Sequence, residues 1–468
     1  MRCAIDEATL ARLRAGIVTG SKETPMVDVS CHSDDTIYAL STTVGKSALA
    51  VVRVSGPQCG AILKRICQKN VFKDRRATVT TILDEDRNIL DRSIVMSFPA
   101  PHSFTGEDMV EFHVTGSRAV IKSLLEALAN CPLTRPAEAG EFARRAFMNG
   151  KLDLAEVEGL ASVVEAETRA QLRHAITSAS GKLSRRCEEA RALVVSAMAV
   201  AESMLDFSDV TDAEALSVDE IISAVSEAST ILSGMLDGAQ VSERLREGLN
   251  VVIAGRPNVG KSTLLNCLAQ RDVAIVSPIA GTTRDTLELA TEIGGFPVTF
   301  IDTAGLRQTV DPLESLGIMR TREKCAYGDL ILWLFDNDDE LRPATELGDR
   351  PVLKVRTKCD LFEDRSPMLD GIRISARSGT GIGILVARIL EFACEHFAGA
   401  GGTVAGTARQ AVAIRDARNA LKNIQRGLPV ELIAEDLRLA AMALARVVGR
   451  VEVEEVLGEI FSRLCVGK

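Results

Sequence analysis

The amino-acid sequence predicts a multi-domain protein with an N-terminal α+β domain, a discontinuous all-α helical domain, and an α/β domain inserted into the helical one. Three observations predict this arrangement. Short apolar runs alternate with turns over residues 35–130, apolar residues recur at helical spacing from 151 and again after 408, and strands alternate with helices in between. At 468 residues the chain is also too long for one hydrophobic core.

The domain boundaries follow from the places where the pattern changes. Each helical stretch carries an apolar face, so the two stretches are expected to meet in space. A Gly- and Ala-rich segment marks the exit from the inserted domain. We expect a poorly structured extension over 1–30, the α+β domain over 31–148, the first part of the helical domain over 149–246, the inserted domain over 247–397, a linker over 398–407 and the second helical part over 408–468.

Composition narrows the class of protein. No apolar run reaches the roughly 18–20 residues of a membrane-spanning helix, and residues 1–30 lack the apolar centre of a secretory signal. The net charge of −9 argues against a protein that coats nucleic acid by charge alone. Eleven cysteines include no Cys-x-x-Cys pair, which argues against a zinc site. We therefore expect a cytoplasmic protein with reduced thiols and no membrane contact.

Periodicity places the elements of the first and second domains. In the α+β domain, apolar runs predict strands at 48–54, 93–98 and 109–114, and a helix at 119–128. In the helical domain, apolar residues step by three and four through 154–164, 193–204, 221–235, 411–426 and 430–448. These are the repeats of amphipathic helices that pack on one another.

The inserted domain begins with a phosphate-binding pattern. A buried-type strand at 249–254 is followed by Gly-x4-Gly-Lys-Ser at 255–262 and then by a helix from Thr263. Glycines at these positions let backbone N–H groups wrap phosphates at a helix N-terminus. Lys261 is expected to neutralise the β- and γ-phosphates, and the Ser262 hydroxyl to ligate Mg²⁺. The loop residues expected to bind nucleotide are Asn258, Val259, Gly260, Lys261, Ser262 and Thr263.

Two further segments come in the order that a Ras-like GTPase requires. Thr283 is expected to close over Mg²⁺ as a second metal ligand with a catalytic role, and Asp302 to hold the metal shell at the end of an apolar strand. The Gly305 N–H would sense the γ-phosphate. The remaining nucleotide-binding residues expected here are Ser277, Pro278, Ile279, Ala280, Gly281, Thr282, Thr303 and Ala304.

The base-reading segment follows two more strands, at 330–335 and 352–355. Asp360 is placed to accept the two N–H donors of a guanine edge, with Lys358 beside it. The usual motif is Asn-Lys-x-Asp, and Thr357 here replaces the asparagine. We still expect GTP rather than ATP, because a carboxylate facing adenine would lack partners. Ser375, Ala376 and Arg377 would complete the base pocket.

One catalytic group is missing from the usual place. Leu306 follows Gly305 where Ras-type enzymes carry a glutamine that orients water, and the sequence identifies no arginine finger. Another charge must then stabilise the transition state. The side-chain carbonyl of Asn258 offers an oxygen beside the phosphates, where a bound monovalent cation would replace an arginine.

These motifs resemble those of the MnmE (TrmE) family of tRNA-modifying GTPases. The resemblance covers residues 35–468. It is carried by Gly-Arg-Pro-Asn-Val-Gly-Lys-Ser and Asp-Thr-Ala-Gly-Leu-Arg, by Ser-Phe-Thr-Gly-Glu-Asp at 103–108, by Arg-Pro-Ala-Glu-Ala-Gly-Glu-Phe at 135–142 with Lys-Leu-Asp-Leu-Ala at 151–155, and by the terminal Cys-Val-Gly-Lys. The family pattern is broken at 42–47 and 114–117 of the first domain.

The resemblance implies an activity and its partners. With the FAD protein MnmG (GidA), in a heterotetramer-type complex, the family adds a carboxymethylaminomethyl-type group to C5 of the wobble uridine of certain tRNAs. A 5-formyl- or methylene-tetrahydrofolate is the one-carbon source. The N-terminal domain binds folate and forms a homodimer. The matching folate residues are Arg53, Glu111, Lys151 and Lys468.

The resemblance also implies how hydrolysis is activated. The G domains pair across the dimer around K⁺, with ligands at Asn258, Ser277, Ile279 and Thr282. Glu314 matches the residue that orients the attacking water, although taken alone it is a solvated carboxylate near a helix start. Two other functions stay open at this point. One is a ribosome-assembly GTPase without modifying activity, and the other is a scaffold regulated by nucleotide.

Overall fold

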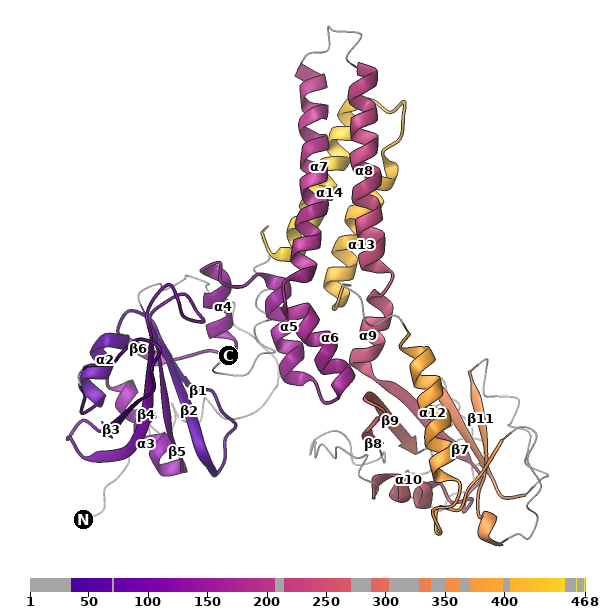
Figure 1. Cartoon of the computed structure of the whole chain (residues 1–468), viewed down its shortest axis with the longest axis horizontal. Helices are drawn as coiled ribbons and strands as arrows, with labels where there is room; N and C mark the ends of the chain where they lie inside the picture. Colours follow the sequence, from indigo (N-terminus) through magenta and orange to yellow (C-terminus); the bar gives the residue numbers. More distant parts are fainter. Residues whose placement is uncertain are drawn as a thin grey trace, which may run out of the picture. The chain divides into compact units, whose positions relative to one another are not determined.

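The computed structural model describes residues 35–69, 71–206, 214–270, 288–302, 328–337, 350–361, 371–398, 405–450, 460 and 467 (Figure 1). They fall into two compact units. The first contains 35–39, 44–97 and 108–136, and the second contains 40–43, 98–107 and the described residues from 137 onward. No helix among these residues combines the length and apolar character needed to cross a bilayer.

The first unit is built on a six-stranded mixed sheet in the order β3-β4-β5-β2-β1-β6. The strands are β1 (Thr36–Leu40), β2 (Ser47–Ser55), β3 (Thr78–Leu83), β4 (Ile89–Phe98), β5 (Met109–Gly116) and β6 (Thr134–Pro136), with helices α2 (Cys59–Ile66) and α3 (Arg118–Ala129). In the β2–β5 pair Val52 lies opposite Phe112, and both are fully buried. The neighbouring Arg53, Glu111 and His113 are only partly buried, because successive residues of a strand point to opposite faces.

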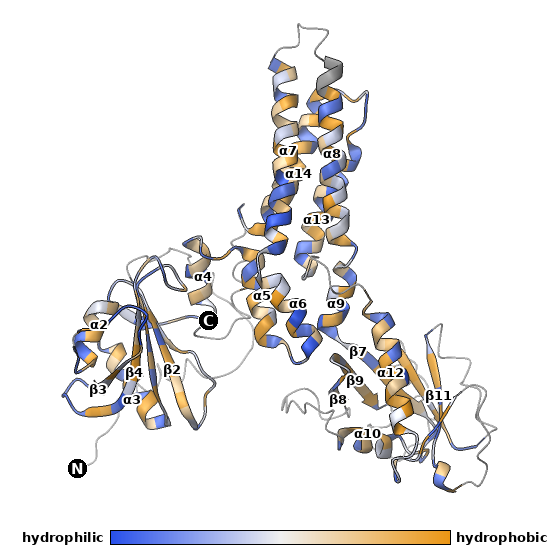
Figure 2. Cartoon of the chain, viewed as in Figure 1, coloured by the Kyte–Doolittle hydropathy of each residue, from blue (hydrophilic) through white to orange (hydrophobic). Residues whose placement is uncertain are grey.

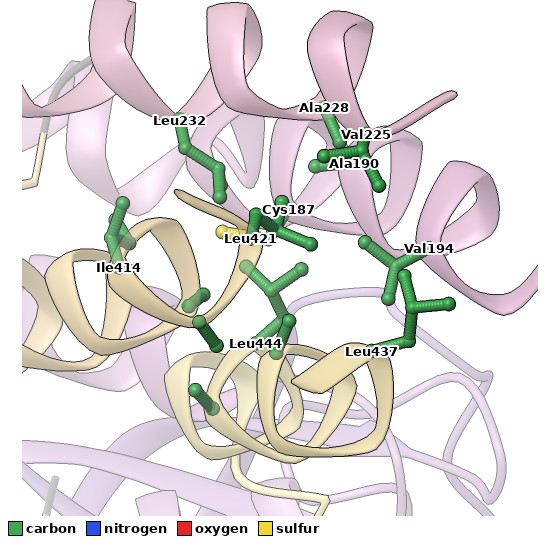
Figure 3. Packing of buried hydrophobic residues seen from close by; sticks show 14 of the residues in the cluster. Cys187, Ala190, Val194, Val225, Ala228, Leu232, Ile414, Leu421, Leu437 and Leu444 are labelled. Atoms are coloured by element: carbon green, nitrogen blue, oxygen red, sulfur yellow. The ribbon is translucent and has the colours of Figure 1, made fainter. Parts of the chain in front are cut away.

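The helical part of the second unit is formed by two stretches of the chain that are far apart in the sequence. Its helices are α4 (Glu141–Met148), α5 (Leu154–Glu165), α6 (Arg169–Ala179), α7 (Lys182–Asp206), α8 (Glu214–Leu236), α9 (Ala239–Glu247), α13 (Ala408–Asn423) and α14 (Val430–Val448). Helices α7, α8, α13 and α14 share one apolar core (Figure 3). Apolar and polar residues alternate along each helix (Figure 2), as amphipathic packing requires.

Small side chains allow these four helices to approach closely. Ala190 of α7, Ala228 of α8 and Ala417 of α13 are fully buried. Larger residues such as Leu232 and Leu437 fill the space between them (Figure 3). Because α13 and α14 lie beyond the inserted domain in the sequence, the helical domain is discontinuous.

The inserted domain is built on a second six-stranded sheet in the order β12-β11-β10-β7-β9-β8. The strands are β7 (Leu249–Gly255), β8 (Glu288–Ile293), β9 (Phe296–Asp302), β10 (Leu330–Phe335), β11 (Val352–Arg356) and β12 (Ile372–Arg373), with α10 (Lys261–Ala269) and α12 (Ile382–His396). Among the described strands of this second sheet, only the β8–β9 pair is antiparallel. Alternate residues of β7 pack into separate apolar clusters, which explains its unbroken apolar run.

Two sets of polar contacts hold together the helices on either side of the inserted domain. Glu158 of α5 accepts hydrogen bonds from Nε and Nη2 of Arg409 on α13, at 2.8 and 2.9 Å, and from the Gln410 amide at 2.6 Å. The Gln171 amide of α6 lies 3.3 Å from the carbonyl oxygens of Leu245 and Arg246, at the end of α9. These contacts hold α9, which precedes the inserted domain, and α13, which follows it.

Candidate nucleotide site

The described residues of the predicted nucleotide site lie at the carboxyl ends of parallel strands. The phosphate-binding loop follows β7, Asp302 ends β9, the base-reading loop follows β11, and Ser375 follows β12. Ligands of open parallel sheets bind at this edge, where the loops converge. The arrangement brings together segments that are up to 120 residues apart in the sequence.

The backbone of the phosphate-binding loop requires glycine at two positions. Gly255 has φ +147°, and a Cβ atom there would lie 2.3 Å from the carbonyl oxygen of Leu334. Gly260 has φ +106° and caps α10, so the helix begins at Lys261. Asn258 also has a positive φ, of 63°. The first backbone N–H groups of α10 have no partner within the helix and are suited to bind an anion.

Lys261 is held under this loop. Its Nζ donates to the carbonyl oxygens of Gly255 and Arg256, at 2.7 and 2.8 Å, and the residue is 6% exposed. Burial lowers the pKa of its ammonium group, and the charge of Asp302 opposes that shift. A phosphate placed on the loop would supply further negative charge to a cation that burial disfavours.

The hydroxyl of Ser262 and the carboxylate of Asp302 form the described part of the predicted metal site. Ser262 Oγ lies 3.2 Å from Asp302 Oδ2, and Asp302 is fully buried. Oxygen donors of this kind suit Mg²⁺, which is usually bound by a few protein oxygens together with phosphate and water. The residues therefore fit the ion, with Ser262 as ligand and Asp302 in its surrounding shell.

The base-reading loop is organised by side-chain contacts. Lys358, with φ +57°, has its Nζ 2.6 Å from Asp336 Oδ2 in the loop after β10. Asp360 is exposed, and a hydrogen bond from the Ser375 hydroxyl lowers the pKa of its carboxyl group. The buried Ser375 also accepts a hydrogen bond from the Ser378 N–H. An ionised carboxylate is thus presented where a guanine edge is expected.

Thr357, the departure from the usual motif, points into the protein. Its hydroxyl donates to the carbonyl oxygen of Val259 in the phosphate-binding loop, at 2.7 Å. Ala376 is half-buried and Arg377 exposed beside the Ser375 turn, while Thr263 is exposed on the first turn of α10. The sequence gives no sign that Thr357 and Val259 touch, because 98 residues separate them.

Part of the predicted site lies outside the described residues. This holds for Ser277, Pro278, Ile279, Ala280, Gly281, Thr282, Thr283, Thr303, Ala304, Gly305 and Glu314. Among the predicted K⁺ ligands, only Asn258 is described, and its side chain is exposed. The roles of these residues stay predictions.

A second polar group lies on the sheet of the first unit. Arg53 on β2 donates to Glu111 Oε1 on β5, with its Nη2 at 2.9 Å, and His113 Nε2 lies 3.2 Å from Glu111 Oε2. Sequence reasoning singled out Arg53 and Glu111 but missed His113. The sequence could have indicated His113, because residues two apart in a strand lie on the same face and His113 follows Glu111 by two. Lys151 belongs to the other compact unit, and Lys468 lies outside the described residues.

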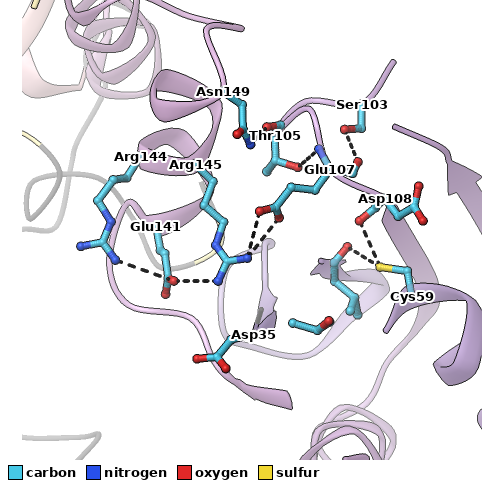
Figure 4. A network of polar contacts seen from close by, with 12 residues as sticks. Asp35, Cys59, Ser103, Thr105, Glu107, Asp108, Glu141, Arg144, Arg145 and Asn149 are labelled. Carbon is cyan, nitrogen blue, oxygen red and sulfur yellow. Dashed lines mark hydrogen bonds and ion pairs between the residues drawn. The ribbon is translucent and has the colours of Figure 1, made fainter. Parts of the chain in front are cut away.

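Two of the sequence motifs meet in a charged network within the second unit (Figure 4). Arg145 Nη1 lies 3.2 and 3.1 Å from the two carboxylate oxygens of Glu107, and its Nη2 lies 3.2 Å from Glu141 Oε1. Glu141 is 1% exposed. The motif at 103–108 is thereby joined to the motif at 135–142 through a residue of α4.

Comparison with known proteins decides the family. The family model of the MnmE helical domain matches residues 154–465, and that of the GTP-binding protein TrmE N-terminus matches residues 36–151. The chain belongs to the MnmE family. The tRNA modification GTPase MnmE of Rhodopseudomonas palustris (strain BisB5) is 43% identical, over 93% of this chain and 99% of that protein. The protein of the same description from Beijerinckia indica is 46% identical, over 93% and 96%.

Among solved structures, an Aquifex aeolicus Era bound to GDP and AlF4⁻ is 25% identical over 39% of this chain and 69% of that chain, with a TM-score of 0.25. The predicted resemblance to the MnmE family is confirmed by the family models and relatives. The predicted multi-domain architecture, with an N-terminal α+β domain, a discontinuous helical domain and an inserted P-loop domain, is confirmed as well.

Proposed function

We propose that this chain is a K⁺-dependent GTPase that acts in tRNA modification. In this proposal it works with MnmG (GidA) to add a carboxymethylaminomethyl-type group to C5 of the wobble uridine of certain tRNAs, using a tetrahydrofolate one-carbon unit. Membership in a family of tRNA modification GTPases supports the enzyme class. The observation that carries the nucleotide part is the convergence of Lys261, Ser262 and Asp302 at the carboxyl edge of a parallel sheet.

The proposed chemistry of hydrolysis rests on charge placed around the phosphates. Lys261 neutralises the β- and γ-phosphates, and Ser262 and Thr283 would hold a Mg²⁺ ion that supplies further positive charge there. Asn258, Ser277, Ile279 and Thr282 would hold K⁺, which would supply the charge of the missing positive side chain when two G domains pair. Glu314 orients the water that Leu306 has no polar group to hold.

The cation and Glu314 can be tested by kinetics. GTP turnover is expected to be faster in K⁺ than in Na⁺ at equal ionic strength, and Asn258→Ala should lose that difference while it still binds GTP. Glu314→Ala should keep nucleotide affinity and lose most turnover. Equal rates in the two salts would remove the cation from the mechanism.

The folate part rests on Arg53 and Glu111. Their partly buried ion pair across β2 and β5 offers a guanidinium, which suits the acidic glutamate tail of folate, and a carboxylate, which suits the N–H groups of its pterin ring. Binding of 5-formyltetrahydrofolate measured by calorimetry should fall in Arg53→Ala and Glu111→Ala, and should be unchanged in Lys122→Ala, an exposed residue of α3. Unchanged binding in both site variants would place folate elsewhere.

The substrate is tested in cells. Loss of the gene should remove the wobble modification, as measured by nucleoside analysis of purified tRNA, and a copy encoding Lys261→Ala should fail to restore it. Unaltered wobble uridines would favour a ribosome-assembly or scaffold function instead. The proposal further places the chain in the cytoplasm, as a homodimer through its N-terminal domain, and in a complex with MnmG that carries FAD.

A further inference from the structure

Thr357, the first residue of the base-reading loop, makes its hydrogen bond to the phosphate-binding loop. Thr357 is 4% exposed, and its Oγ1 lies 2.7 Å from the Val259 carbonyl oxygen and 3.4 Å from that of Phe335. Both of these carbonyl oxygens can only accept hydrogen bonds. Because a threonine hydroxyl carries a single proton, that proton is donated to the protein backbone and is not available to the base.

The consequence concerns which atoms of the base are read. Guanine presents N7 and O6 as acceptors, whereas its N1–H and N2–H groups are donors. Asp360, when ionised, only accepts hydrogen bonds, so it pairs with the donors. An acceptor such as N7 needs a donor from the protein. The asparagine of the usual motif has two amide protons and can both bind a backbone carbonyl and donate to the base, but threonine cannot.

We propose that Thr357 fastens the base-reading loop to the phosphate-binding loop and leaves guanine N7 without a hydrogen bond from this position. The proposal rests on the proposed GTPase function and specifies how that site recognises its base. Guanine selectivity then depends on Asp360, which the Ser375 hydroxyl orients, and on the turn at Ala376. Thr357 is a positioning residue for Val259 and the loop that carries Lys261.

The wild-type chain provides the first test. Dissociation constants for GDP and for 7-deaza-GDP, in which N7 is replaced by C–H, are measured with Mg²⁺ on the full chain by calorimetry. We expect the two constants to agree within about twofold, because no hydrogen bond to N7 is lost. A 7-deaza-GDP affinity lower by tenfold or more would overturn the proposal while leaving GTP as the substrate. Failure to bind GDP at all, or binding of GDP no tighter than ADP, would overturn the proposed function as well.

Three variants separate anchoring from base reading. Thr357→Asn adds an amide proton and should create a preference for GDP over 7-deaza-GDP of about fivefold or more, within the range of one hydrogen bond. Thr357→Ser keeps the hydroxyl and should show no preference. Thr357→Val removes the anchor and should weaken both nucleotides by the same factor. A folded Thr357→Asn protein that still treats the two nucleotides alike, or a Thr357→Val protein that loses affinity for GDP alone, would overturn the assignment.

Discussion

At the scale of single residues, the candidate site depends on buried or constrained side chains whose partners are backbone carbonyls. Lys261 donates to two of them and Thr357 to a third, all within or beside the phosphate-binding loop. Such contacts hold the loop in the shape that its glycines permit. They also mean that removing either side chain takes away a contact that supports the geometry of the loop.

Lys261→Ala should remove the main positive charge from the phosphate-binding loop. Loss of a charge-assisted interaction with the β- and γ-phosphates is expected to cost about 3 kcal/mol or more, which corresponds to at least about 100-fold in affinity for a non-hydrolysable GTP analogue. Calorimetry of the binding of that analogue measures the effect. Lys422→Ala, on an exposed position of α13, is the matched control and should bind like the wild type.

Asp360→Asn should change which base the site prefers. The amide offers a donor as well as an acceptor, so it matches xanthine, which carries a carbonyl where guanine carries an amino group. GDP affinity is expected to fall by about 100-fold, and xanthosine diphosphate affinity to rise. Competition binding with the two nucleotides checks the exchange. A variant that still prefers GDP would show that Asp360 does not read the base.

At the scale of elements, the helical domain is closed by contacts between α5 and α13. The side chains of Glu158 and Arg409 are 9% and 21% exposed, and Arg409 also donates to the carbonyl oxygens of Arg446 and Val447 at the end of α14. One arginine therefore connects three helices, at the point where the chain returns from the inserted domain. Buried ion pairs of this kind are costly to break, because the remaining charge is left unpaired.

Glu158→Ala should destabilise the helical domain by about 3 kcal/mol, since Arg409 and Gln410 both lose their partner. Urea denaturation followed by circular dichroism measures the change in free energy of unfolding. Glu189→Ala is the control, because its ion pair with Arg186 is exposed and should contribute within about 0.5 kcal/mol. Equal effects of the two substitutions would mean that the Glu158 contact adds no more than a surface pair.

At the scale of the whole molecule, the four long helices and the inserted sheet have separate apolar cores, although Leu245 of α9 packs into the core of the sheet. Helices α7, α8, α13 and α14 share one cluster, whereas the sheet around β7 packs with α10 and α12 in others. The chain re-enters the helical domain at the end of α8, one short helix before the point at which it left, where the Ala405 N–H donates to the Met235 carbonyl at 3.1 Å. Removing the inserted domain therefore leaves the core of α7, α8, α13 and α14 intact.

A chain in which residues 249–404 are replaced by about ten Gly and Ser residues should retain a folded helical domain. A flexible linker of this length spans roughly 17 Å, which suits two ends that lie on neighbouring helices. Thermal unfolding followed by circular dichroism should stay cooperative, and GDP binding should be lost. A non-cooperative transition would show that the inserted domain is needed for the helical core to form.

The sequence by itself determined the family and those elements whose apolar pattern is strongly periodic. Hydrophobic periodicity predicted the strands β2, β5 and β7 and the helices α13 and α14, because a residue's face in a strand or helix follows from its spacing. The phosphate-binding loop was predictable for the same reason, since its glycine positions and the following helix are local features. Periodicity did not predict the short strand β6, which depends on pairing with β1.

The tertiary structure alone decided which side chains meet. Thr357 binds Val259 across 98 residues, Arg409 binds Glu158 across 251, and His113 joins the pair of Arg53 and Glu111. No spacing rule predicts such contacts, because the spacing of residues relates a position only to its few neighbours along the chain. The hydrogen-bond partner of a side chain depends on how whole elements pack. In this protein that packing brings Thr357 into contact with the phosphate-binding loop.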